Sequence, residues 1–164
     1  MTLISFLWLV FNGCDEGRRF EAPAVAFDAD VPKPVDLRKV MELGDFDEWQ
    51  KATGLFGHAY TEEILRIGVG DDPTIVTEFQ TFLTHPNIAP IEAAIDTTSG
   101  APERLQQNQE LLTRAFQRFI YWFPEATLPQ VMWMNTGFNY AVYPTDQYLG
   151  IGLEWFLGLS LIHI

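Results

Sequence analysis

Helical spacing of apolar residues characterises the chain from Asp36 to Phe123. Apolar side chains recur three and four residues apart in several stretches, and we predict a helix in each of them: 36–44, 45–52, 61–67, 74–83, 88–95 and 101–123. The glycines at 54–57 predict a break between the second and the third of these helices. The last helix is the longest, and Pro124 ends it because proline lacks the N–H that a helix interior needs.

The last third of the chain has the pattern of strands instead. Residues 131–135 form an almost entirely apolar run that is typical of a buried strand. Two further runs of aromatic and β-branched residues, 138–142 and 148–153, are separated by a proline-containing turn sequence at 144–146. This arrangement predicts a hairpin or a meander.

Two glycines interrupt the second run of the predicted hairpin. Glycine inside a strand usually marks a bulge or a close backbone approach, so Gly150 and Gly152 indicate tight packing. We also expect a short edge strand at 24–27. Together these elements predict an α+β fold, in which a mainly helical N-terminal two-thirds packs on a small C-terminal β-sheet.

Composition agrees with a single globular domain. The chain has 164 residues, of which 48% are hydrophobic and 14% are aromatic, and this is enough to bury a core. The formal net charge is -12, and the ten Lys and Arg residues are scattered along the chain. A phosphate-binding surface needs clustered basic residues, so we exclude nucleic acid as a partner. We interpret the acidity as a solvated surface rather than as an acidic binding function.

The beginning of the chain has the features of a lipoprotein signal. Residues 3–11 form an apolar run that is far shorter than the ~20 residues of a membrane-spanning helix. Gly13 and Cys14 follow it, and a small residue directly before a cysteine is the lipobox pattern. We therefore predict a signal peptide at 1–13, lipid attachment at Cys14, and a tether with the edge strand at 14–35. The alternative is a buried free cysteine, and the lack of Lys or Arg before the apolar run leads us to expect an upstream start.

The last six residues, LSLIHI at 159–164, are what a common transposase adaptor of sequencing libraries encodes in this frame. We predict that they are an artefact and that 36–158 is an incomplete domain that continues past Gly158. The alternative is a genuine apolar strand at the end of the chain.

The sequence contains no recognisable catalytic or metal-binding motif. Zinc peptidases place two histidines one helical turn apart beside a glutamate base, in the pattern HExxH. The three histidines, His58, His85 and His163, do not have this spacing, and there is no GxSxG motif for a nucleophilic serine. We therefore predict no catalytic residue, no metal and no cofactor for the residues given.

Two polar residues lie in apolar surroundings and are candidates for a structural or functional role. Asn139 lies between two aromatic residues, and we interpret it as structural, with its side chain hydrogen-bonded to the backbone. Glu154 is either buried and functional, in which case it needs a partner, or outward-facing on a half-exposed strand. We favour the outward-facing alternative.

Aromatic residues are concentrated in the same part of the chain. They could line a groove for a peptide or a glycan, but aromatic side chains more often fill the core between helices and a sheet. We interpret the following residues as core: Trp122, Trp133, Tyr140, Tyr143, Tyr148 and Trp155.

Several of these segments resemble one known family. Residues 136–140 (TGFNY), 149–158 (LGIGLEWFLG) and 121–124 (YWFP) resemble the gliding motility-associated lipoprotein family GldB of the Bacteroidota. Residues 27–28 resemble its early Arg-Phe-Asp element without the Arg. The resemblance implies an envelope lipoprotein needed for surface gliding, with a fold distantly similar to zinc-dependent peptidases. It does not supply a biochemical activity.

Two functional hypotheses follow from these observations. The first is a non-enzymatic cell-envelope protein, anchored to the membrane by a lipid on Cys14 with its domain outside the cytoplasm, that supports gliding by binding other envelope proteins. The second is a zinc-peptidase-like hydrolase whose metal-binding helix lies beyond Gly158. An HExxH motif past that glycine would favour the enzyme.

Overall fold

The computed structural model describes residues 30–42, 44–70 and 72–158. The predicted signal peptide, the lipid-attachment residue Cys14, the edge strand at 24–27 and the adaptor-like end at 159–164 lie outside the described residues and stay predictions. Of the predicted tether, residues 30–34 have no regular secondary structure, and a strand begins at Val35.

The helices of the described chain are, in order, α2 (Leu37–Glu42), α3 (Phe46–Thr53), α4 (Phe56–His58), the π-helix η1 (Ala59–Leu65), α5 (Ile75–Thr84), α6 (Ala89–Thr97) and α7 (Pro102–Trp122). Each predicted helical stretch overlaps one of these helices, and the ends differ by up to two residues. Local sequence signals explain several helix ends. The side chain of Asp45, for example, accepts hydrogen bonds from the backbone N–H groups of Asp47 and Glu48 at the start of α3.

The predicted break at 54–57 is partly wrong. Gly54 ends α3 with a φ of 50°, but Gly57 lies inside α4, which continues directly into η1. At Gly57 the helix packs closely on α3, because a Cβ there would lie 2.7 Å from Thr53 Oγ1. This glycine therefore permits close helix packing and does not end a helix.

The sheet contains β1 (Val35–Asp36), β2 (Gln130–Met134), β3 (Val142–Pro144) and β4 (Tyr148–Gly152), in the order β1-β2-β4-β3, and the 3-10 helix η2 (Leu153–Phe156) follows β4. The pairs β1–β2 and β2–β4 are parallel, whereas β3–β4 is antiparallel. The predicted strand at 131–135 and the predicted hairpin are confirmed. The first hairpin strand, however, begins only at Val142, because residues 136–139 turn back on themselves and Phe138 has a φ of 63°.

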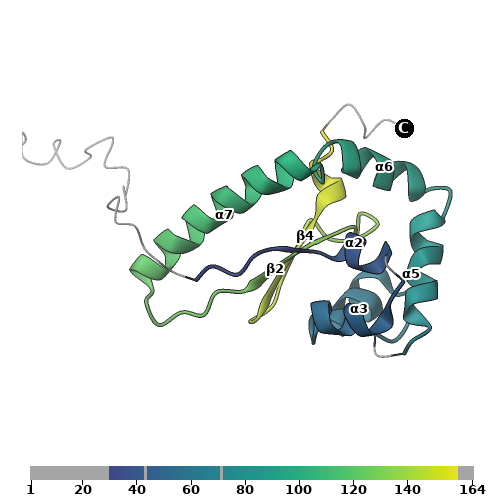
Figure 1. Ribbon diagram of the computed structural model, residues 1–164, viewed down its shortest axis with the longest axis horizontal. Helices are drawn as coiled ribbons and strands as arrows, with labels where there is room; N and C mark the ends of the chain where they lie inside the picture. The colour runs from purple at the N-terminus through teal and green to yellow at the C-terminus, as the bar shows by residue number, and fades with distance from the viewer. Residues whose placement is uncertain (1–29, 43, 71, 159–164) are drawn as a thin grey trace, which may run out of the picture.

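Side chains alternate between the two faces of the central strand β2, and each face has its own core. Met132 and Met134 pack against the cluster that α2, α3, η1 and α5 form, which includes the buried Trp49 and Phe79. Val131 and the other residues of the opposite face pack with α6, η2 and, less tightly, α7. In Figure 1, α7 runs along one side of the sheet. Helices α2, α3 and α5 are grouped together at one end of the sheet. A strand covered on both faces explains the continuous apolar run in the sequence.

The expected close approach at the β4 glycines is confirmed. A Cβ at Gly150 would lie 2.5 Å from Met134 Cε, and a Cβ at Gly152 would lie 2.4 Å from the carbonyl oxygen of Tyr140. The second contact involves the backbone, which cannot move aside as a flexible side chain can. Gly152 therefore lets residues 135–140 lie directly against β4.

Candidate functional site

Three polar segments meet at one edge of the sheet, because the three parallel strands all end there. Asp36 is the last residue of β1, Asn135 follows β2, and Glu154 lies two residues after β4. The edge beyond the carboxyl ends of parallel strands is where open α/β sheets commonly place functional groups. Residues 135–140, called the aromatic loop below, connect this edge to β3.

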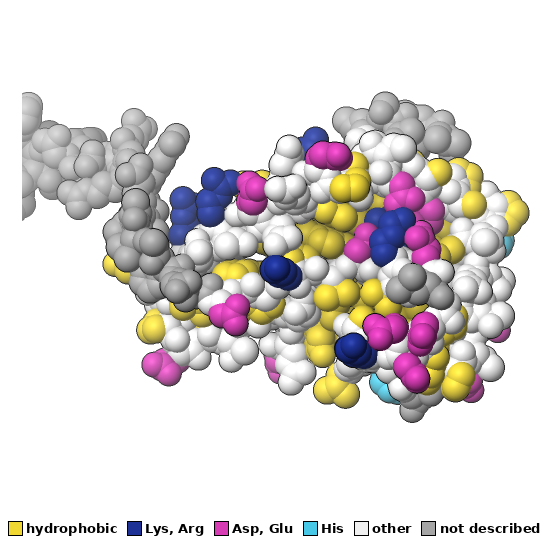
Figure 2. Space-filling view, in the orientation of Figure 1, with side chains coloured by type: hydrophobic (Ala, Val, Ile, Leu, Met, Phe, Trp, Pro, Cys, Tyr) yellow, Lys and Arg dark blue, Asp and Glu magenta, His cyan; other side chains and the backbone are white. Residues whose placement is uncertain are grey.

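Arg38 forms the first part of a polar network under this edge. Its side chain is fully buried, and its guanidinium group donates to Asp36, to Glu92 Oε2 at 3.1 Å and to Asp96 Oδ1 at 3.0 Å. Burial alone would lower the pKa of Arg38, but the carboxylates, Asp36 above all, raise it overall. Arg38 is therefore always charged. Figure 2 shows basic side chains surrounded by Asp and Glu side chains at the position of α2.

Asn135 connects this charge cluster to the aromatic loop. Its Nδ2 donates to Glu92 Oε1 at 2.6 Å, and its Oδ1 accepts from the backbone N–H of Gly137 at 2.9 Å. The hydroxyl of the buried Tyr60 donates to the carbonyl oxygen of Asn135 at 2.8 Å, and burial raises the pKa of that hydroxyl well above its ordinary value. Asn135 is therefore hydrogen-bonded to η1, to α6 and to the loop itself. These bonds fix the position of the start of the aromatic loop.

Glu154 holds the middle of the aromatic loop. Its Oε1 accepts from the backbone N–H of Thr136 at 2.8 Å and of Phe138 at 3.1 Å, and it contacts the Thr136 hydroxyl. Thr136 Oγ1 in turn accepts from the backbone N–H of Tyr140 at 3.1 Å. The carboxylate therefore orders a turn of the backbone in the way that an anion orders the start of a helix.

The interpretation of Glu154 as outward-facing is wrong. The residue is only 1% exposed, because β4 ends at Gly152 and η2 turns the side chain under the aromatic loop. Burial raises the pKa of Glu154, and the hydrogen bonds from Thr136 and Phe138 oppose that rise. Its Oε2 is buried without a hydrogen-bond partner among the described residues.

The hydrogen bond between the Asn139 side chain and the backbone is present, as expected for the structural interpretation. Asn139 Nδ2 donates to the carbonyl oxygen of Ile64 at 2.9 Å, so the side chain ties the aromatic loop to the end of η1. That carbonyl has no partner within a regular α-helix, because η1 ends at Leu65 and Arg66 takes a left-handed conformation with a φ of 57°.

The aromatic residues divide between core and surface, so the interpretation of all of them as core is wrong in part. Trp133 is buried, and Tyr143 and Tyr148 pack partly against the core. Three others are well exposed: Trp122 at 53%, Tyr140 at 38% and Trp155 at 46%. These three lie at the end of α7, on the aromatic loop and on η2, where no described layer covers them.

The aromatic loop and η2 together present aromatic rings to solvent. Phe138, which is 42% exposed, contacts Trp155 edge to face with ring centroids 5.7 Å apart. Tyr140 and Tyr143 form a second such pair at 5.3 Å. Hydrogen bonding to Glu63 raises the pKa of Tyr143 to about 12, so this hydroxyl remains a neutral donor. Each pair includes one residue of the aromatic loop, whose backbone the buried network holds in place.

The histidines that the structure describes do not assemble into a site. His58 Nδ1 lies 2.9 Å from Glu62 Oε1 one turn along the same helical segment, and His85 lies in the turn after α5. Within residues 30–42, 44–70 and 72–158, we find no group of three or more His, Cys, Asp or Glu side chains arranged to hold a metal ion. Nor does any helix in these ranges have the length and apolarity required to cross a membrane.

The fold and the site define an α+β domain in which a buried polar network at one sheet edge fixes an exposed aromatic loop. The sequence model described as gliding motility protein GldB matches residues 25–161, so this chain belongs to the GldB family. No curated protein and no solved structure matches the chain. The family resemblance is therefore confirmed, and the distant similarity to zinc-dependent peptidases stays a prediction.

Proposed function

We propose that this chain is a lipid-anchored protein of the cell envelope that supports gliding motility by binding another envelope protein through its aromatic loop. Membership of the GldB family supports the cellular role. The observation that carries the binding role is the exposed pair of Phe138, on the aromatic loop that Glu154 fixes, and Trp155, on η2 beside it. Aromatic residues are enriched at protein interfaces and dominate their binding energy.

The rigidity of the loop favours binding. An interface that orders a flexible loop loses about 0.5–1.5 kcal/mol for each immobilised side chain, and a preformed loop avoids much of this cost. Here the loop backbone is tied to Glu154, the Asn135 side chain is tied to Glu92, and the Asn139 side chain is tied to η1. We therefore expect the aromatic loop to have nearly the same conformation in the free protein as in the complex with its partner.

A motility assay with surface variants tests the binding role. The change is Phe138→Ala with Trp155→Ala, introduced into the gene at its own locus in the gliding source bacterium. The matched control is Phe119→Ala with Phe123→Ala, because these residues form another exposed aromatic pair, with centroids 5.1 Å apart, at the far end of α7. We expect loss of colony spreading in the first strain alone, with equal amounts of protein in both.

Photo-crosslinking provides the second readout. A photoreactive amino acid at position 155 should capture a discrete envelope protein in gliding cells, whereas the same group at position 123 should not. Normal spreading of the Phe138/Trp155 strain, together with no specific crosslink from position 155, would overturn the binding role.

The lipid anchor is tested separately. An acyl chain contributes about 0.8 kcal/mol per buried methylene, and a multiply acylated cysteine anchors a domain durably. We expect the wild-type protein to incorporate labelled palmitate and to sediment with membranes, and Cys14→Ser to abolish both. Undiminished palmitate labelling of Cys14→Ser would show that the lipid is attached at another residue.

A further inference from the structure

A second feature lies on the face of the sheet opposite the large helical cluster. Helix α7 spans 21 residues, yet none of them is fully buried. Between α7 and the strands is an open groove of about 960 Å³, called the cavity below, whose volume is at the upper end of the range for small-molecule sites. Its walls come from the segment between α6 and α7, from α7 as far as Ala115, and from β2, β4 and η2.

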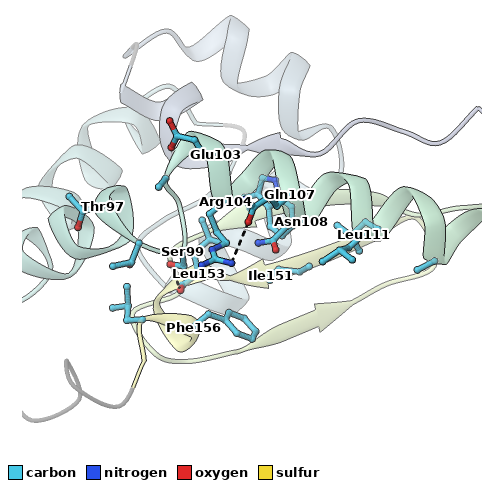
Figure 3. Close-up of a pocket in the computed structure, with 16 residues that line it drawn as sticks. Thr97, Ser99, Glu103, Arg104, Gln107, Asn108, Leu111, Ile151, Leu153 and Phe156 are labelled. Carbon is cyan, nitrogen blue, oxygen red and sulfur yellow. Dashed lines mark hydrogen bonds between the residues drawn. The ribbon is translucent and has the colours of Figure 1, made fainter.

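Polar and apolar groups are separated within this cavity. The floor contains Trp133, Ile151 and Leu153, and Leu111 and Ala115 continue the apolar wall along α7. The polar side chains of α7 are nearer the start of the helix, and Figure 3 shows Arg104, Gln107 and Asn108 pointing from α7 toward the strands. The distance along the helix from Arg104 to Ala115 is about 16 Å, from 1.5 Å per residue.

The polar end of the cavity supplies donors for an anion. The guanidinium of Arg104 makes one long contact that the described residues show, a 3.4 Å hydrogen bond to Gln107 Oε1, and it has no carboxylate partner among them. The hydroxyls of Thr98 and Ser99 already donate to backbone carbonyls. Glu103 is the one acidic residue among the described residues of the lining, and in Figure 3 its carboxylate points away from the strands.

We propose that this cavity binds a free fatty acid anion of medium chain length. The carboxylate head lies at Arg104, where a guanidinium can bind both oxygens at once, and Gln107 and Asn108 supply further amide donors. The alkyl chain lies along the apolar floor toward Ala115, where its burial supplies the hydrophobic part of the affinity. No residue of the aromatic loop lines this site, although both sites adjoin η2, and the proposal does not depend on the motility role.

Calorimetric titration of the whole chain with dodecanoate, below its micelle concentration, tests the proposal. We expect saturable one-to-one binding, and dodecanol, which lacks the charge, should bind about fivefold more weakly. Arg104→Gln should weaken dodecanoate binding by a similar factor, since the Arg104 side chain is exposed and an exposed ion pair contributes up to about 1 kcal/mol. The matched control is Arg114→Gln, which removes the same charge from an exposed position of α7 outside the cavity and should bind as the wild type does.

A steric variant shows whether the ligand lies in the cavity. Ala115→Trp should abolish binding while the midpoint of urea unfolding stays unchanged, because Ala115 is exposed at the cavity wall. Unchanged dodecanoate binding by Ala115→Trp, or equal binding by the Arg104 and Arg114 variants, would overturn the proposal. So would binding to phosphatidylglycerol vesicles without binding of the free acid. A dimer that Ala115→Trp disrupts, with no dodecanoate binding, would assign the cavity to a second copy of the chain.

Discussion

Replacing Arg38 with Met should destabilise the domain more than any other single charge removal near the aromatic loop. The substitution keeps the apolar part of the side chain but removes the guanidinium from a fully buried position. The carboxylates of Asp36 and Glu92, whose side chains are each only 14% exposed, would then remain without their cation. Asp96 is 42% exposed, and water can replace the lost contact there.

The size of the effect follows from these exposures. Removing one partner of a buried ion pair typically lowers the free energy of unfolding by about 3–5 kcal/mol, because a buried charge is left uncompensated. The loss at Asp96 should add little, since exposed pairs contribute about 0–1 kcal/mol. We therefore expect Arg38→Met to lower the free energy of unfolding by about 3–5 kcal/mol at neutral pH. A domain of ordinary stability, about 5–15 kcal/mol, would still fold.

Urea unfolding, followed by circular dichroism, measures this loss. Burial raises the pKa of Glu92, although the nearby Asn135 and Arg38 oppose the rise, so removal of Arg38 should raise the pKa further. The loss of stability should then be greatest at neutral pH and shrink as the pH falls and Glu92 becomes protonated. Adding Glu92→Gln to Arg38→Met should restore part of the stability, because the uncompensated charge is gone.

The control is Lys39→Met, the next residue of the same helix, whose exposed side chain pairs with Glu42 and Asp96. Its effect should be below about 1 kcal/mol. A loss of less than about 1 kcal/mol for Arg38→Met, or a loss that is the same at neutral and acidic pH, would refute the reasoning.

Three further substitutions probe the contacts around the loop. Because burial raises the pKa of Glu154, its protonated form stabilises the folded state below the unfolded pKa, and this stabilisation is lost as pH rises through the folded pKa. Glu154→Gln should therefore flatten the fall of unfolding free energy above the unfolded pKa of about 4.3, and an unchanged slope would contradict this assignment. Gly152→Ala should lower the unfolding free energy by about 1–3 kcal/mol, since its Cβ would lie 2.4 Å from Tyr140 O, and a crystal structure should show the loop displaced. Tyr60→Phe leaves the carbonyl of Asn135 without its buried donor and should lower the unfolding free energy by about 1–3 kcal/mol in urea titrations; full stability would mean that water replaces the hydroxyl.

The sequence predicted the helices and the hairpin well, because apolar spacing, proline and glycine act locally. The two-residue strand β1 was not predicted, since Val35 and Asp36 form a strand only by pairing with β2, almost a hundred positions away. The polar network was not predicted either, because its contacts also join residues that are far apart in the sequence. Glu92 on a predicted helix and Asn135 at the end of a predicted strand have no local signal of a contact, and only the fold brings their side chains to 2.6 Å.

Glu154 shows why alternation along a strand can mislead. An alternating pattern assigns each residue to a face only while the strand continues, and β4 ends at Gly152. The glycine that permits the close approach of Tyr140 also ends the strand, and the next side chains follow the 3-10 geometry of η2. The close backbone approach at Gly152 was predicted correctly. The change in chain direction after Gly152, however, depends on packing against the aromatic loop, which is not a local signal.

The parallel pairing of β1 with β2 also governs how the chain can fold. Val35 reaches its partner Met132 only after all the helices from α2 to α7 have been synthesised, and β4 must follow before the sheet has its central pair. Contacts between such distant segments form slowly, since a long loop has to close first. Helices α2 to α5 are therefore complete, with apolar faces uncovered, before the strand they pack against emerges. Until β2 has been synthesised, the first half of this domain exposes apolar surface, and we expect substitutions that weaken β2 to prolong this exposure more than substitutions in the helices do.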